Sequence, residues 1–184
     1  MAALALKELA DSPNSNLPLN QRVESLALAT LHAKSSSTEA SERAPVDFVT
    51  ELEEQTDVAN IQMEIWQAIV NASDVPDDIK ASKVADLENG GLRDISELWS
   101  EFAFPLSLLE MMLVILKVSD HRDVELVAEI WETLFERAME EAGSDKAEVQ
   151  FVQLKELVER LGKKLYPSGA FPTSEWISLP VSFV

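Results

Sequence analysis

Apolar residues recur at intervals near 3.6 residues in every long segment of this chain, and no segment sustains the two-residue alternation of a β-strand. The clearest stripe has i, i+3, i+4 spacing and consists of Val124, Val127, Trp131, Leu134, Phe135 and Ala138. A helix with such a stripe is stable only when the stripe is buried against other elements. The pattern therefore predicts an all-α fold of amphipathic helices that pack on one another.

Turn residues and capping residues set the expected bounds of these helices. Pro45 suits a first turn, residues 94–97 (DISE) resemble a capping box, and Gly90, Gly91 and Gly143 suit helix ends. We expect helices over residues 20–34, 45–71, 77–87, 94–103, 106–118, 123–142 and 145–165, with one more beginning at 171–177. The apolar run 111–116 would also suit a buried strand, but no partner strand exists, which favours a helix.

Short loops between these segments favour antiparallel neighbours. The predicted architecture is an irregular antiparallel helical bundle or a piece of an α-solenoid, and no sequence repeat assigns a named repeat class. In the helix over residues 20–34, the expected buried stripe consists of Val23, Leu26, Ala27, Thr30 and Leu31. The most apolar window, residues 102–116, contains Pro105 and Glu110 and is shorter than the roughly 20 apolar residues that span a bilayer.

The charge balance excludes several classes of partner and site. Thirty-three acidic side chains against fifteen basic ones give a net charge of -18. Binding to nucleic acid requires clustered Lys and Arg that neutralise phosphates, and docking to an anionic membrane surface has the same requirement. We therefore expect no nucleic-acid partner and no direct membrane contact. The chain has no cysteine, so disulfides, thiolate catalysis and Cys-ligated zinc are excluded.

Polar residues that could suggest a metal or phosphate site occur in unsuitable patterns. His32 and His121 lie far apart in the sequence on different elements, whereas a zinc site needs several ligands held together. The aspartates of the segment 73–78 lack the Gly and terminal Glu of a calcium loop and suit a helix N-terminus instead. Gly162 and the two lysines after it follow no strand or glycine-rich loop. Close helix packing or chance would explain this glycine inside a helix.

Two further groups of residues are interpreted as structural. An acidic stripe predicts a solvated helix face, with a basic partner segment as the alternative, and consists of Glu125, Glu129, Glu132, Glu136 and Glu140. Apolar helix faces carry all four tryptophans, which predicts core positions for Trp66, Trp99, Trp131 and Trp176. No Ser-His-Asp arrangement or dinucleotide fingerprint occurs. The residues predict a non-enzymatic scaffold with no catalytic, metal or cofactor-binding residues, no cofactor and no small-molecule substrate.

A collinear series of short blocks resembles a known family. The blocks are residues 19–24 (LNQRVE), 33–35 (AKS), 48–54 (FVTELEE), 58–62 (VANIQ), 95–99 (ISELW), 102–105 (FAFP), 121–123 (HRD), 130–131 (IW), 166–167 (YP) and 171–172 (FP). In this order and spacing they resemble the C-terminal α-solenoid of the large inner-ring scaffold nucleoporins, the vertebrate one-fifty-five and yeast one-seventy family. Phe104 departs from the family, which more often has a polar or acidic residue there.

The resemblance implies a structural role in the nuclear pore complex, at the nuclear envelope of the nucleus. It implies that the partners are other nucleoporins and short linear motifs of linker nucleoporins. An alternative is a free-standing helical-repeat adaptor that binds a basic or amphipathic peptide. The resemblance divides the chain into a short N-terminal helix and linker (residues 1–16), a nucleoporin C-terminal-like helical fragment (17–177) and a dissimilar tail (178–184). It covers a small part of a full-length member and leaves out the N-terminal β-propeller.

Overall fold

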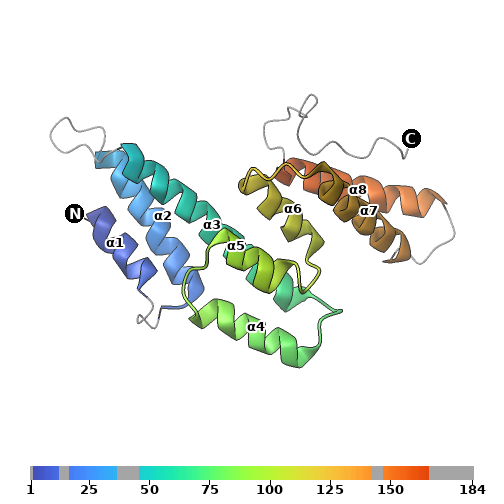
Figure 1. Cartoon of the computed structure of the whole chain (residues 1–184), viewed down its shortest axis with the longest axis horizontal. Coiled ribbons are helices and arrows are strands. Elements are labelled where there is room, and N and C mark those ends of the chain that lie inside the picture. Colours follow the sequence, from blue (N-terminus) through green and yellow to red (C-terminus); the bar gives the residue numbers. More distant parts are fainter. Residues whose placement is uncertain (1, 13–16, 37–45, 142–146, 166–184) are drawn as a thin grey trace. The chain divides into compact units, whose positions relative to one another are not determined.

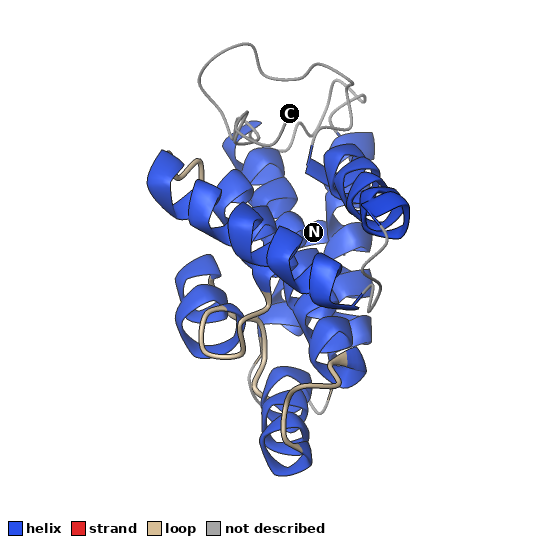
Figure 2. Cartoon of the chain, turned by 90° about the vertical axis from the view of Figure 1, so that its right-hand side faces the viewer, coloured by secondary structure: helices blue, strands red, loops and turns tan. Residues whose placement is uncertain are grey.

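The computed structural model describes residues 2–12, 17–36, 46–141 and 147–165. Within these ranges every regular element is helical, as Figure 2 shows, so the predicted all-α composition is confirmed. The elements are α1 (Ala2–Asp11), α2 (Leu19–Ser36), α3 (Val46–Asn71), α4 (Asp77–Asn89), α5 (Ile95–Glu97), the π-helix η1 (Leu98–Ala103), α6 (Leu109–Val118), α7 (Val124–Glu141) and α8 (Ala147–Leu165). Two compact units divide between Leu108 and Leu109.

The first unit is built on α1, α2 and α3, which lie side by side (Figure 1). Their shared core is rich in small side chains and consists of Ala10, Leu26, Ala29, Ala33, Leu52 and Ala59. Small residues let helix backbones approach closely, so few large side chains are needed to fill the space between them. Polar contacts at the edge add to the packing, since Lys7 lies 3.5 Å from Glu51 and Gln55 donates a hydrogen bond to Asp11.

The buried face of α2 differs from the predicted stripe. Leu26 and Thr30 are buried as expected, but Leu31 is 63% exposed and Ala27 is also exposed. The structure instead buries Ala29 and Ala33. The prediction was wrong at these positions because the predicted stripe followed Leu31 and so lay to one side of the face that meets α1 and α3, which carries the small residues Ala29 and Ala33.

Arg22 is the one charged residue buried among the described residues, and it joins α1 to α2. Its side chain is 1% exposed, and its guanidinium donates to three backbone carbonyls: Ala10 O at 2.6 Å, Ser12 O at 2.9 Å and Leu17 O at 3.1 Å. The last carbonyls of a helix have no partner within the helix, and the C-terminal end carries partial negative charge. The buried cation satisfies the Ala10 carbonyl in the last turn of α1 and the Ser12 carbonyl just after it, and so holds α1 against α2.

Gln62 on α3 is a second buried side chain that forms hydrogen bonds with backbone groups near a helix end. It is fully buried, its Nε2 donates to Leu87 O (3.2 Å) and Gly91 O (2.8 Å), and its Oε1 accepts from Arg93 N (2.8 Å). One side-chain amide therefore satisfies one carbonyl in the last turn of α4 and two backbone groups in the segment that follows it. Gly91 occupies this turn with φ +87°, a conformation that residues with a Cβ rarely adopt.

The segment after Gly91 differs from the helix predicted over residues 94–103. The capping box is confirmed: Glu97 N donates to Asp94 Oδ1 at 2.8 Å, and Asp94 N donates to Glu97 Oε2 at 3.2 Å. After one α-helical turn, the backbone continues as a π-helix over Leu98–Ala103. The helix predicted to start at residue 106 starts at Leu109, because a turn containing Ser107 at φ +49° intervenes.

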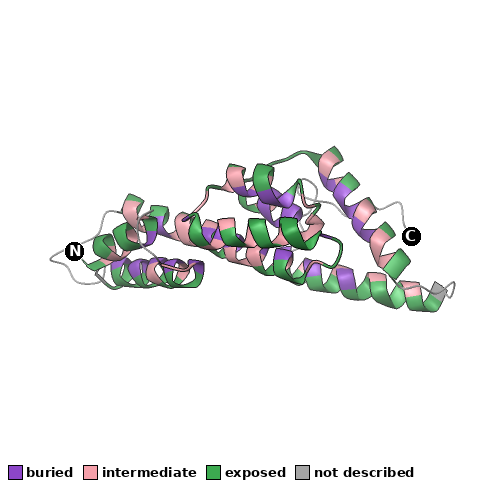
Figure 3. Ribbon diagram, turned by 90° about the horizontal axis from the view of Figure 1, so that it is seen from below, coloured by how far each residue is buried: buried purple, intermediate pink, exposed green. Residues whose placement is uncertain are grey.

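The second unit consists of α6, α7 and α8, which pack on one another. All six side chains of the run 111–116 are buried, so the prediction of an interior helix is confirmed. On α7 and α8 the buried residues follow one side of each helix (Figure 3), and on α8 they are Leu157, Leu161 and Leu165. At the rim, Arg160 forms a bidentate ion pair with Glu110, with both N–O distances 2.6 Å.

The remaining helix ends lie within two residues of their predicted positions, and the helix expected from residue 171 lies outside the described residues. Close packing does not explain Gly162, because a Cβ placed there would meet no atom within 4 Å. No described helix is both long and apolar enough to cross a bilayer.

Arg22→Met is expected to lower the free energy of unfolding by about 2–4 kcal/mol, because one buried and two part-buried carbonyls lose their donor. Arg160→Met is the matched control: it removes an exposed ion pair, so it should change stability by about 1 kcal/mol or less. Urea denaturation measures both, and hydrogen exchange of α1 amides adds a local readout. Equal destabilisation by the two variants, without faster exchange in α1, would contradict the assignment.

Gln62→Glu is expected to destabilise the fold by about 2–4 kcal/mol near neutral pH, because a buried carboxylate would face two carbonyl oxygens. Burial raises the pKa of such a carboxyl above about 4.3, its unfolded value. The unfolded state then loses its proton first as pH rises, so the destabilisation should shrink on acidification toward about pH 4. Thermal melts of wild type, Gln62→Glu and the exposed Gln67→Glu across pH measure this. A difference in melting temperature between wild type and Gln62→Glu that does not change with pH would contradict this prediction.

Gly162→Ala is expected to stabilise the protein by about 0.5–1 kcal/mol, because alanine restricts the unfolded chain and the site has open space for its Cβ. Gly91→Ala is the opposite case, since positive φ strains any residue with a Cβ. Thermal denaturation of the two variants should therefore show melting temperatures that move in opposite directions.

Candidate interaction surfaces

The described residues contain no group of three or more His, Asp or Glu side chains placed to hold a metal ion. His32 is exposed on α2, and His121 is exposed in the loop between α6 and α7. Asp77 and Asp78 lie in the first turn of α4, where carboxylates interact favourably with the helix dipole.

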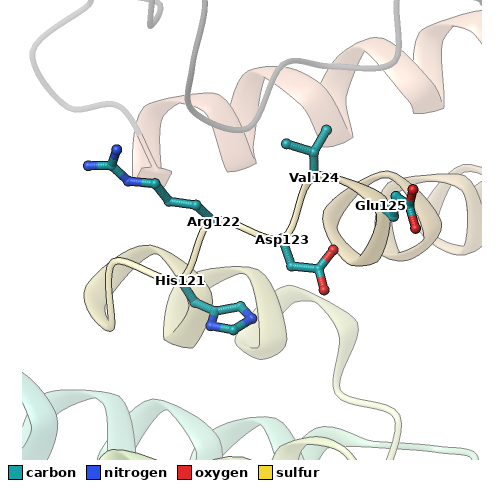
Figure 4. Close-up of a pocket in the computed structure, with 5 residues that line it drawn as sticks. All are labelled: His121, Arg122, Asp123, Val124 and Glu125. Atoms are coloured by element: carbon teal, nitrogen blue, oxygen red, sulfur yellow. The ribbon is translucent and has the colours of Figure 1, made fainter.

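An open surface depression is lined by five consecutive residues, His121 to Glu125, and all five are exposed (Figure 4). Their interactions are those of a helix start: Asp123 Oδ1 accepts from Leu126 N at 3.0 Å, and Arg122 pairs with Asp120 at 3.6 Å. His121 and Asp123 point to one side of the loop, whereas Arg122 points to the other (Figure 4). This depression lacks the enclosed, convergent arrangement of a catalytic or ligand pocket.

The acidic stripe of α7 lies on the side of the helix opposite its buried residues. Glu125, Glu129, Glu132, Glu136 and Glu140 are all exposed. The buried side of the same helix consists of Val127, Ile130, Trp131, Leu134 and Phe135. This placement agrees with the solvated face that the sequence predicts.

Three groups in the described residues have displaced pKa values, and each lies on a different helix. A hydrogen bond to Asp11 raises the pKa of Lys7 above its ordinary value, and hydrogen bonds to Glu110 raise the pKa of Arg160 above its ordinary value. Burial lowers the pKa of Lys117 below 10.5. The Lys7 shift accompanies an ion pair within α1 and a weaker one with Glu51 of α3, and the Arg160 shift accompanies the pair that joins α8 to α6. Both shifts reflect packing rather than acid–base chemistry.

The tryptophans differ in burial. Trp131 is 2% exposed and lies 5.5 Å from Phe135 between ring centroids, so the predicted core position is confirmed. Trp66 and Trp99 are half-buried, and Trp176 lies outside the described residues. Trp99 is the tryptophan that takes part in an exposed aromatic pair.

Trp99 and Phe104 form this pair, which we call the aromatic ridge. Their ring centroids are 6.1 Å apart and their planes differ by 25°. The π-helix creates the pair: Phe104 N donates to Trp99 O at 3.0 Å, an i→i+5 hydrogen bond that places residues five apart on one side. In an α-helix the same two residues would lie about 140° apart around the axis and could not stack.

The aromatic ridge rests on a buried base and faces solvent. On the same π-helix, Leu98, Phe102 and Ala103 are buried, and the Lys83 ammonium lies 4.7 Å from the Phe102 ring centroid. Phe104 itself is 59% exposed, and Pro105 next to it is also exposed. Sequence reasoning noted Phe104 as a departure from the family pattern but missed the ridge, because helical spacing was assumed to continue at 3.6 residues.

The chain is similar to large scaffold nucleoporins. It is 29% identical over 164 residues to nuclear pore complex protein Nup154 of Drosophila melanogaster, covering 88% of this chain and 12% of that protein. It is 28% identical to nucleoporin NUP170 of Saccharomyces cerevisiae, covering 99% of this chain and 12% of that protein. The chain thus spans about an eighth of the length of these relatives.

Solved structures share the fold. The chain superposes on a mutant of the Chaetomium thermophilum Nup170 CTD with a TM-score of 0.79 and 19% identity, covering 100% of this chain and 34% of that one. The Nup170 CTD in complex with Nup145N gives a TM-score of 0.74 and 20% identity, covering 89% and 33%. These similarities confirm the predicted fold class, an all-α segment of an α-solenoid.

A family model confirms the resemblance that the sequence blocks indicate. The model that describes the C-terminal region of non-repetitive/WGA-negative nucleoporins matches residues 1–179, which includes the first unit and all but the last five residues of the second. This chain therefore belongs to the non-repetitive/WGA-negative nucleoporin C-terminal family.

Proposed function

We propose that this chain is a structural constituent of the nuclear pore complex, a segment of its inner-ring scaffold at the nuclear envelope. The observation that carries the proposal is the family match over residues 1–179. The solenoid fold supports it, because stacked helices present extended surfaces to partners and need no catalytic pocket. The proposed role is protein–protein interaction in support of nucleocytoplasmic transport, without enzymatic activity or a cofactor.

The proposed partners are other nucleoporins and short linear motifs of linker nucleoporins. A solved relative supports this: the Chaetomium thermophilum Nup170 CTD forms a complex with Nup145N. The net charge of -18 supports protein partners over nucleic acid or an anionic membrane surface. The domain division proposed here assigns residues 17–177 to the nucleoporin-like helical fragment, residues 1–16 to a short helix and linker, and residues 178–184 to a tail.

A segment exchange in yeast tests this function. The matching segment of Saccharomyces cerevisiae NUP170 is replaced by this chain, and the fluorescent chimera is compared with full-length NUP170 and with a deletion that lacks the segment. The chimera is expected at the nuclear rim, where it should co-purify with nucleoporins more fully than the deletion. A folded chimera that behaves like the deletion would contradict the scaffold function and favour the free-standing adaptor.

A further inference from the structure

We propose that the aromatic ridge, Trp99 and Phe104, is a docking site for a short segment of a partner protein. The segment carries one aromatic or large aliphatic anchor residue with Lys or Arg on either side of it. This inference rests on the proposed scaffold function, since it assigns a surface and a peptide chemistry to the short partner motifs of that function.

The ridge is fixed in position by the backbone beneath it. Two i→i+5 hydrogen bonds, Phe104 N to Trp99 O at 3.0 Å and Leu108 N to Ala103 O at 2.9 Å, hold the wide turn open. The buried residues Leu98 and Phe102 anchor the same turn to the unit. An anchor residue would therefore meet two rings that are already stacked, and little conformational entropy is lost on binding.

Aromatic side chains at such positions contribute strongly to binding. Phe104 is 59% exposed although it is packed on Trp99, so one face of the pair is open to a partner. Large aromatic side chains provide much apolar contact area with few rotatable bonds, and they dominate the binding energy of many interfaces. π-helices are rare and frequently occur at functional sites, which agrees with a turn kept in order to place these two rings.

The charge around the ridge selects a basic partner. Residues 94–108 include three acidic residues, Asp94, Glu97 and Glu101. Two cations lie in the same region: Lys83 lies over the Phe102 ring, and Arg93 pairs with Asp86 and Glu97, so acidic side chains outnumber basic ones there. Glu101 is exposed and lies between Trp99 and Phe104 in the sequence. A second copy of this chain would carry the same net charge of -18 and would be repelled, whereas Lys or Arg beside an apolar anchor would be attracted.

Phe151 provides an internal comparison. It is 68% exposed on α8, more than Phe104, and it lies in a regular α-helix. The described residues place no second ring beside it, since their stacked or tilted ring pairs are Trp99 with Phe104 and Trp131 with Phe135. If exposure alone determined peptide binding, Phe151 would serve as well as Phe104.

The test uses the full chain and a fluorescent peptide with a central Phe flanked on both sides by Lys. Two control peptides replace the Phe by Ser or the Lys by Glu, and fluorescence anisotropy measures the affinities. We expect Phe104→Ser to weaken binding at least tenfold, about 1.4 kcal/mol, while Phe151→Ser changes it less than about twofold. Glu101→Lys should weaken binding mainly at low salt.

Three results would overturn the proposal: no binding of the Lys–Phe peptide by the wild-type chain, equal binding by Phe104→Ser, or a loss with Phe151→Ser. Circular dichroism of each variant verifies that helix content is retained. A yeast chimera that reaches the nuclear rim without peptide binding would leave the scaffold function in place and reject the ridge. Peptide binding by the chain, combined with a diffuse chimera, would reject the scaffold function instead.

Discussion

The first unit depends on hydrogen bonds from buried side chains to backbone carbonyls where helices end. A helix end removed from water must satisfy several carbonyls that have no partner within the helix. Arg22 does this at the end of α1, and Gln62 does it where the chain leaves α4. Because each side chain reaches two or more separate groups, it also determines which helix packs on which. Arg22 holds α1 against α2 beside the small-residue core that these two helices share with α3.

These two side chains also show what two of the sequence blocks that resemble the family do in the fold. Arg22 belongs to the block 19–24, and Gln62 belongs to the block 58–62. Neither residue was singled out from periodicity, because a polar residue on a helix is ordinarily assigned to solvent. Apart from the bond from Arg22 to Leu17 O, their polar contacts join residues 10 or more apart in sequence, such as Arg22 with Ala10 and Gln62 with Leu87. Such contacts cannot be predicted from the local sequence pattern.

Helix positions could be predicted closely, but helix faces and the aromatic ridge could not. Pro, Gly and capping residues determine where helices begin and end, and these are local signals. The buried face of α2 depends on its neighbours α1 and α3, so Leu31 was assigned to the core although it is exposed. The ridge depends on a change of the backbone hydrogen bonds from i→i+4 to i→i+5. This change accompanies the burial of Phe102 and Ala103. It produces no periodic pattern of apolar residues in the sequence.

The π-helix also affects how this segment can change in length over evolution. An i→i+5 turn holds one residue more than an α-helical turn, so its loop of backbone can absorb a single-residue insertion without ending the helix. A homologue with one residue fewer between the positions of Trp99 and Phe104 would place the two rings at i and i+4 of a regular α-helix, where side chains still share a face. A single-residue gap at this point in an alignment would then mark a change from π-helix to α-helix that keeps both rings on one side, whereas the full spacing keeps them together only while the π-helix persists.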